Sequence, residues 1–144
     1  MKSPAFDYIR ARSVAHALEA YRSLDGEGVY LAGGHSVVPS LTLRLQAPAA
    51  LIDLSGIDAL TGISLDDGWL RIGAMTRHAE VAADPMIRDH AHLFHLAAPH
   101  VAHPAIRNRG TIGGSLSLAD PASEFPAVAL ALRAEMEVAG HDGV

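Results

Sequence analysis

Two short glycine-rich segments of the chain carry the residue types that bind phosphate. The first is Ala32-Gly33-Gly34-His35-Ser36, and the second is Thr111-Ile112-Gly113-Gly114-Ser115. Glycine allows unusual backbone angles and close approach of a ligand, so successive N–H groups of a turn can converge on an anion. The hydroxyl groups of Thr111 and Ser115 can donate further hydrogen bonds to phosphate oxygens. Two turns of matching chemistry therefore predict a site for both halves of a pyrophosphate group.

Neither segment has the sequence of a standard nucleotide-binding loop. No Gly-Lys-Ser or Gly-Lys-Thr follows the glycines, and the G-x-G-x-x-G pattern of a dinucleotide-binding turn is absent from the sequence. Paired glycines also occur in ordinary turns, so either loop alone is weak evidence for phosphate binding. The prediction depends on the two loops together.

The elements around the first loop predict a small β-α-β lobe. Residues 13–24 are typical of an amphipathic helix that Ser13 caps and Asp25-Gly26 ends. Residues 28–32 form a short β-favouring run before the glycines, and helical spacing follows them. Residues 50–54 indicate a second, buried strand. The first loop is thus expected between a strand and the start of a helix.

Antiparallel structure and helices are expected beyond residues 55–60. Asp67-Gly68 suits a two-residue hairpin turn between strands 63–66 and 69–72. Thr76 is predicted to cap a helix that Asp84-Pro85 stops, and Pro99 to kink or end the next one. After a loop over 103–115, Pro126 is expected to begin a helix, and 134–139 to form a strand. Trp69 and the apolar residues of 128–132 are assigned to the core.

Composition excludes several kinds of function. The chain has 144 residues, is 49% hydrophobic and carries a formal net charge of −5, which suits a compact globular protein and disfavours nucleic acid as a partner. It contains no cysteine, so iron–sulfur ligation and thiol chemistry within this chain are excluded. The sequence shows neither a signal peptide nor a transmembrane stretch, which predicts a cytoplasmic protein.

Other reactive residues do not form a recognisable catalytic or metal-binding pattern. The chain has nine histidines, but only His92 and His95 of the group between residues 90 and 103 share a helical face, so no metal site is predicted. Ser36 and Ser115 lie outside any G-x-S-x-G elbow, and no catalytic residue is assigned. His35 is interpreted either as a shaping residue of its loop or as a phosphate neighbour. Arg107 and Arg109 could neutralise a pyrophosphate or form surface ion pairs.

The sequence resembles the FAD-binding subunits and domains of molybdenum hydroxylases, of the carbon monoxide dehydrogenase and xanthine dehydrogenase type. The resemblance extends over essentially the whole chain. Its motifs are PAFDY (4–8), AGGHS (32–36), LIDLSGI (51–57), LRIGAMT (70–76), IRNRGTIGGS (106–115), ADPASEFPA (119–127) and ALRAEMEVAG (131–140). The most specific of them is IRNRGTIGGS followed by ADPA.

The resemblance implies an α+β, two-lobed FAD-binding domain of the vanillyl-alcohol-oxidase/PCMH type. Residues 1–56 would form the N-terminal lobe, and residues 57–144 a second antiparallel lobe that is incomplete at its C-terminus. Residues 32–36 and 111–115 would bind the FAD diphosphate, and Asp120 and Glu124 would accept hydrogen bonds from ribityl or ribose hydroxyls. Leu118, Arg77 and Pro99 depart from the family's usual pattern.

The resemblance also implies an electron-transfer role and two partners. Electrons would come from a large molybdopterin subunit through a small iron–sulfur subunit, and FAD would pass them to an acceptor. Two alternatives stay open at this point. The chain could be a truncated domain that lacks FAD and acts as a scaffold, because turn residues end it without a return strand. It could also be a vanillyl-alcohol type oxidase, for which His35 would be a weak candidate for covalent flavin attachment.

Overall fold

The chain forms two compact units that combine helices and sheets. The computed structural model describes residues 2–140 and 143. The first unit consists of Met1–Ala59 and Glu137–Val144, and the second of Leu60–Met136. The expected α+β class is confirmed by the mixed content of helix and sheet. The assignment of residues 1–56 and 57–144 to two FAD-binding lobes stays a prediction.

A three-stranded parallel sheet forms the centre of the first unit. Its strands β1 (Asp7–Arg10), β2 (Gly28–Leu31) and β3 (Ala50–Asp53) lie in the order β1-β3-β2, with β3 buried throughout. The predicted β-α-β arrangement of β2 and β3 is confirmed. Strand β1 was not predicted, because Ile9 is its only half-buried residue and the strand lacks an apolar pattern.

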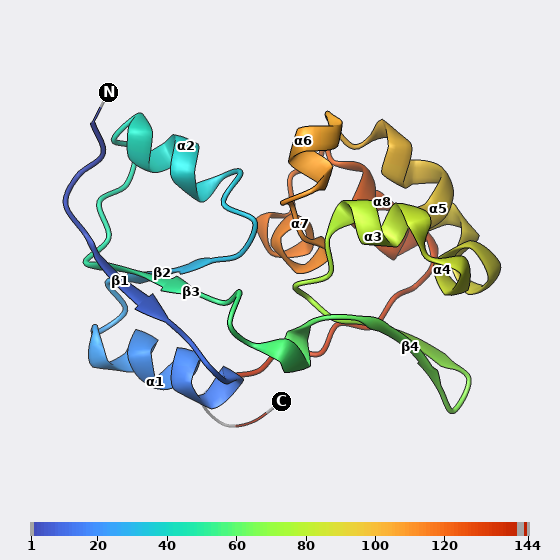
Figure 1. Ribbon diagram of the computed structural model, residues 1–144, viewed down its shortest axis with the longest axis horizontal. Coiled ribbons are helices and arrows are strands. Elements are labelled where there is room, and N and C mark those ends of the chain that lie inside the picture. Colours follow the sequence, from blue (N-terminus) through green and yellow to red (C-terminus); the bar gives the residue numbers. More distant parts are fainter. Residues whose placement is uncertain (1, 141–142, 144) are drawn as a thin grey trace. The chain divides into compact units, whose positions relative to one another are not determined.

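Helices cover both faces of this sheet. Figure 1 shows α1 (Val14–Ser23) on one face and α2 (Val37–Thr42) on the other. Helix α1 begins as predicted, since the Ser13 hydroxyl accepts a hydrogen bond from the His16 N–H at 3.1 Å. It ends where Asp25 and Gly26 adopt positive φ angles of 50° and 83°. Because the strands are parallel, the segments that follow β1, β2 and β3 all lie at the same edge of the sheet.

A buried carboxylate at the end of β3 connects two of these strands. Asp53 is 7% exposed and accepts hydrogen bonds from the Tyr8 hydroxyl of β1, from the Ser55 N–H at 2.9 Å and from the Ser55 hydroxyl at 2.8 Å. Burial opposes ionisation, but these hydrogen bonds and the positive charge of Arg10 together lower the pKa of Asp53 below its ordinary value. The hydrogen bond to Asp53 also raises the pKa of the Tyr8 phenol.

Asp53 is expected to make the stability of the protein depend on acid pH. A carboxyl whose pKa is lower in the folded state contributes stability that is complete above its unfolded pKa of about 3.9 and disappears as the pH falls through the folded pKa. At pH 7 we expect Asp53→Asn to lower the free energy of unfolding by about 1–2 kcal/mol. Urea unfolding from pH 7 to pH 3 measures this. The difference in free energy of unfolding between wild type and variant should shrink below about pH 4. An unchanged difference would contradict the stabilising role of the ionised Asp53 carboxylate.

The second unit combines a hairpin with short helices. Strands β4 (Ile63–Asp66) and β5 (Trp69–Ile72) pair in antiparallel fashion, and Asp67 and Gly68 have the positive φ angles, 47° and 80°, that were expected at the turn. The helices are α3 (His78–Ala83), α4 (Pro85–His90), α5 (His92–Ala97), α6 (Pro104–Arg107), α7 (Ile112–Leu118) and α8 (Glu124–Ala131), with the 3₁₀ turn η2 (Ala98–His100). The 3₁₀ turn η1 (Asp58–Leu60) lies where the sequence passes from the first unit to the second.

The core of the second unit is built around Phe125. Its side chain is 0% exposed and meets the ring of Phe94 edge-on, with centroids 5.2 Å apart. Ile112, at the start of α7, belongs to the same cluster and joins the second glycine loop to this core. The remaining buried members are Val81, Ile87, Ala91, Ala98, Val101, Val128 and Ala129.

Several predicted element boundaries in this unit are wrong. Thr76 does not cap α3, because its buried hydroxyl donates to the Gly62 carbonyl at 3.0 Å and Arg77 occupies the cap position. The predicted loop over 103–115 contains α6 and the start of α7. Helix α8 begins at Glu124 rather than at Pro126, and residues 134–139 form no strand. Pro99 lies in η2, directly after α5, so the predicted break of that helix is confirmed.

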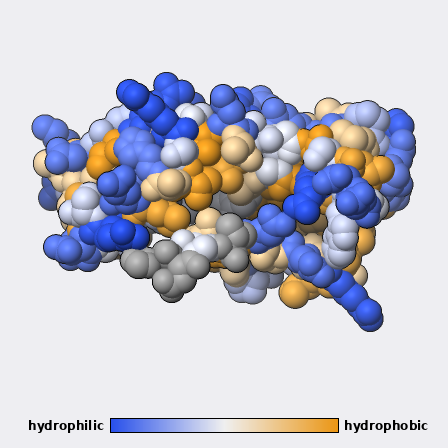
Figure 2. Space-filling model, turned by 90° about the horizontal axis from the view of Figure 1, so that it is seen from below, coloured by the Kyte–Doolittle hydropathy of each residue, from blue (hydrophilic) through white to orange (hydrophobic). Residues whose placement is uncertain are grey.

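The predicted core assignment of several large apolar residues is also wrong. Trp69 is 55% exposed, Leu130 77% and Leu132 42%, whereas Val128 and Ala129 of the same stretch are buried. Helical spacing identified the stretch but not the side of α8 that faces the core. Apolar residues therefore reach the exterior, and Figure 2 shows such patches in orange among hydrophilic residues in blue.

Candidate functional site

The first glycine loop connects β2 to α2 at the carboxyl edge of the parallel sheet. Gly34 has a φ of +78°, which L side chains rarely adopt. The backbone N–H groups of four consecutive residues have no acceptor among residues 2–140 and 143. They belong to Gly33, Gly34, His35 and Ser36. His35 and Ser36 are exposed. The loop thus contains a row of backbone donors without an acceptor in the described residues, which is a feature that the predicted anion site requires.

The second glycine loop is attached to the segment 74–78 by backbone hydrogen bonds. The Gly113 N–H donates to the Ala74 carbonyl at 2.8 Å, the Ile112 N–H donates to Thr76 at 3.0 Å, and the His78 N–H donates to Gly110 at 3.0 Å. A Cβ atom on Gly113 would lie 2.6 Å from both the Cβ and the carbonyl oxygen of Ala74. Close backbone approach therefore requires glycine at position 113.

The N–H groups of residues 112–115 in the second loop are used within the protein, unlike those of the first loop. The Gly114 N–H donates to the Thr111 hydroxyl at 3.2 Å, and the Ser115 N–H donates to the Thr111 carbonyl at 3.1 Å. Besides the Thr111 N–H, the donors that this loop can offer to a ligand are consequently the hydroxyl groups of Thr111, which is 3% exposed, and of Ser115, which is half-buried. Ser115 is half-buried, and its Oγ lies 3.0 Å from Nε2 of His78, a residue that the sequence analysis did not single out.

Asp120 lies between α7 and α8, and Glu124 begins α8. Asp120 is exposed, and its carboxylate accepts a hydrogen bond from the Ala122 N–H of its own turn at 2.9 Å. Glu124 is half-buried and is the first residue of α8. Leu118 is 56% exposed at the end of α7. The predicted contacts of Asp120 and Glu124 with cofactor hydroxyls stay predictions.

Arg107 has a structural role that neither sequence-based interpretation included. Its Nη1 donates to three backbone carbonyls, those of Pro99 at 3.2 Å, Val101 at 3.0 Å and Ala102 at 2.8 Å. The guanidinium thus holds the turn that follows η2, in which Ala102 has a positive φ of 41°. Arg109, by contrast, is exposed.

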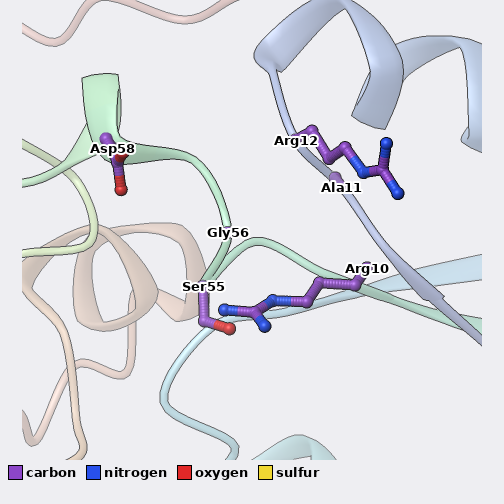
Figure 3. Close-up of a pocket in the computed structure, with 6 residues that line it drawn as sticks. All are labelled: Arg10, Ala11, Arg12, Ser55, Gly56 and Asp58. Carbon is purple, nitrogen blue, oxygen red and sulfur yellow. The ribbon is translucent and has the colours of Figure 1, made fainter.

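A pocket of about 350 Å³ lies at the carboxyl edge of the sheet in the first unit. Figure 3 shows the Arg10 side chain extending toward Ser55, whereas the Arg12 guanidinium points away. The other lining residues are Ala11, Gly56 and Asp58. This polar group was not predicted from the sequence, although Arg10 ends β1 and Ser55 follows β3, at the same edge as the first glycine loop.

The histidines within residues 2–140 do not gather around a metal site. Among residues 2–140 and 143, no group of three or more His, Asp or Glu side chains could hold a metal ion. The rings of His92 and His95 lie 5.8 Å apart, but Nδ1 of each lies within hydrogen-bonding distance of a backbone carbonyl, that of Arg88 at 3.1 Å and that of Ala82 at 3.0 Å. In the same described part of the chain, none of the helices is long and apolar enough to span a membrane.

Comparison with known families identifies the cofactor of this chain. Residues 4–144 match the family described as "FAD binding domain in molybdopterin dehydrogenase". The chain belongs to this family. FAD is therefore its cofactor, as the resemblance in the sequence implied, and the vanillyl-alcohol-oxidase/PCMH class of fold is supported by the solved structures described below.

Similar proteins are subunits of several dehydrogenases. The chain is 45% identical to the 6-hydroxypseudooxynicotine dehydrogenase complex subunit alpha of Paenarthrobacter nicotinovorans, over 93% of this chain and 45% of that protein. It is 36% identical to the carbon monoxide dehydrogenase medium chain of Hydrogenophaga pseudoflava, over 99% of this chain and 50% of that one. The chain thus spans about half the length of the curated relatives it matches.

Solved structures have the same fold. Carbon monoxide dehydrogenase from Hydrogenophaga pseudoflava, lacking the Mo-pyranopterin moiety of its cofactor, superposes with a TM-score of 0.97 at 36% identity, over 99% of this chain and 50% of that chain. Quinoline 2-oxidoreductase from Pseudomonas putida 86 gives a TM-score of 0.95 at 38% identity, with the same shares covered. This FAD-binding domain is therefore closely similar in structure to parts of molybdenum hydroxylases.

Proposed function

We propose that this FAD-binding domain serves an electron-transfer subunit of a molybdenum hydroxylase, and that its two glycine loops bind the FAD diphosphate. The observation that carries the proposal is the first loop. Four consecutive N–H groups there have no acceptor within the described residues, and Gly34 has a backbone angle that favours glycine. An anionic diphosphate matches such a row of donors.

The residues of both loops fit this cofactor chemically. In the first loop, Ala32 and Gly33 would lie along the diphosphate, and the N–H groups of Gly34, His35 and Ser36 would donate to its oxygens. In the second loop, Ile112 and Gly113 attach the loop to segment 74–78. Thr111 and Ser115 would offer their hydroxyls, and Gly114 would allow close approach. Asp120 and Glu124 would accept hydrogen bonds from ribityl or ribose hydroxyls.

The chain's own contribution is to bind and orient the cofactor. FAD supplies the redox chemistry when bound, so an acid–base residue is not required and no catalytic residue is assigned. In the proposed complex, electrons come from a large molybdopterin subunit through a small iron–sulfur subunit and leave through this domain to an acceptor. We place the complex in the cytoplasm. Subunit names of the relatives, such as medium chain and complex subunit alpha, support an assembly of this kind.

The substrate would be selected by another subunit. Three relatives are named for 6-hydroxypseudooxynicotine, caffeine and carbon monoxide. This chain is 45%, 40% and 36% identical to these three proteins, respectively. Molecules so different in size and polarity require different pockets, whereas the segment shared with this chain keeps one fold. We therefore propose that this domain fixes the cofactor and leaves the choice of substrate to a partner.

Visible absorption of the purified protein after desalting tests the proposal. We expect the two flavin bands to remain with wild type and to be lost with Gly34→Val, because a β-branched residue at positive φ costs about 1–3 kcal/mol and distorts the row of donors. Gly68→Val is the matched control, since Gly68 has a φ of +80° and open space around it in the hairpin turn. A wild-type protein that stays colourless with added FAD would contradict the proposal and favour a scaffold role.

A further inference from the structure

His78 contacts the second glycine loop from inside the protein. Its ring is 4% exposed, and Nε2 lies 3.0 Å from the Thr111 carbonyl oxygen and 3.0 Å from the Ser115 Oγ. These contacts join the first residue of α3 to both ends of the segment 111–115. A buried histidine at this position therefore influences the geometry of the loop's hydroxyl donor.

The Thr111 carbonyl determines whether His78 donates or accepts in its hydrogen bond with Ser115. A carbonyl oxygen can only accept, so Nε2 of His78 carries the proton and shares it between Thr111 O and Ser115 Oγ. Ser115 then accepts through its oxygen, and its own hydroxyl proton points elsewhere. Among residues 2–140 and 143, no hydrogen-bond acceptor for this proton is found.

The ring of His78 is held in place on two sides. Phe125 meets it edge-on with centroids 4.8 Å apart. On another side the ring packs against Gly110. A Cβ atom at this position would lie only 3.1 Å from Cε1 and 3.2 Å from Nδ1 of the ring. The His78 N–H also donates to the Gly110 carbonyl at 3.0 Å. The ring can therefore not turn without moving the core, which fixes the direction of Nε2–H.

We infer that His78 is a positioning residue for FAD: its Nε2–H holds the Ser115 hydroxyl as an acceptor, so that the Ser115 proton is donated to a phosphate oxygen. The inference rests on the proposed function of the second loop. It assigns the donor role in this loop to a side chain, since the N–H groups of residues 112–115 already have acceptors within the protein.

A double-mutant cycle on FAD affinity tests the inference in the purified protein. We expect Ser115→Ala and His78→Leu each to raise the Kd for FAD about 10-fold, and the double variant to raise it about 10-fold as well, because both remove the same hydrogen bond to phosphate. His95→Leu is the matched control. His95 lies in the same unit and its Nδ1 is 3.0 Å from the Ala82 carbonyl oxygen, but it does not contact the loop. The His95→Leu variant should bind FAD with the Kd of wild type.

Conservative variants keep the test valid if His78→Leu does not fold. Gln can place an N–H group near the position of Nε2, whereas Asn is too short to reach Ser115. We expect His78→Gln to bind FAD within about 3-fold of wild type and His78→Asn to lose about 10-fold.

A Kd for FAD that rises about 100-fold in the double variant would show that the two effects are independent and would overturn the inference. Equal FAD affinities of His78→Gln and His78→Asn would overturn it as well. So would an unchanged Kd for Ser115→Ala. A wild-type protein that binds no FAD would instead overturn the proposed function, and the inference with it.

Discussion

Gly113→Ala is expected to separate the second glycine loop from segment 74–78 and to abolish FAD retention. The added Cβ would lie 2.6 Å from the Ala74 Cβ and carbonyl oxygen and 2.9 Å from its Cα, so backbone rather than a flexible side chain must move. The Gly113 N–H would also lose its 2.8 Å hydrogen bond to Ala74. We expect the free energy of unfolding to fall by about 3 kcal/mol. Urea unfolding and absorption after desalting measure the two effects.

Gly140→Ala provides the matched control for this substitution. Gly140 has no positive φ, and a Cβ there would meet only the Gly143 carbonyl oxygen, at the ordinary distance of 3.8 Å. We expect this variant to keep both its stability and its flavin. If Gly113→Ala behaved like Gly140→Ala, the attachment of the loop to segment 74–78 would not be what keeps FAD bound.

Phe125→Ala is expected to cause the largest loss of stability in the second unit. Phe125 is 0% exposed and contacts the rings of Phe94 and His78 edge-on. Its truncation removes this packing and leaves a cavity, which lowers the free energy of unfolding by about 3–5 kcal/mol. Fluorescence of Trp69, the single tryptophan of the chain and a residue of β5, follows urea unfolding of this unit.

Leu130→Ala tests whether this loss depends on burial. Leu130 lies on the same helix α8 but is 77% exposed, so we expect a change within about 0.5 kcal/mol. Comparable losses in both variants would show that Phe125 is not central to the core. Phe125→Ala should also weaken FAD binding at concentrations of urea that leave the protein folded, since it frees the ring of His78.

Features that depend on neighbouring residues were predictable from the sequence. Asp67-Gly68 supplies its own positive φ angles, and Ser13 caps α1 through a residue three positions away. The two glycine loops were likewise found from their residue types, and the family resemblance named FAD. The turn and cap predictions succeed because their interactions close within one turn of the chain, whereas the assignment of the two loops to FAD stays a prediction.

Features that depend on which face of an element is covered were not predictable. The spacing in 128–132 fits a helix, yet only packing decides that Val128 is buried and Leu130 exposed. Thr76 has the chemistry of a cap, but Gly62 provides a carbonyl that its hydroxyl reaches inside the protein. Strand β1 has little apolar character and forms because β3 offers it an edge.

The amino-acid sequence by itself predicted the cofactor, which the family match confirms, and the two loops that are proposed to bind it. Only the tertiary structure decided which groups in those loops are available to a ligand. His78 reaches Ser115 across 37 positions, and Tyr8 reaches Asp53 across 45. Spacing carries no signal for such pairs, because the folded core brings them together and the local backbone does not.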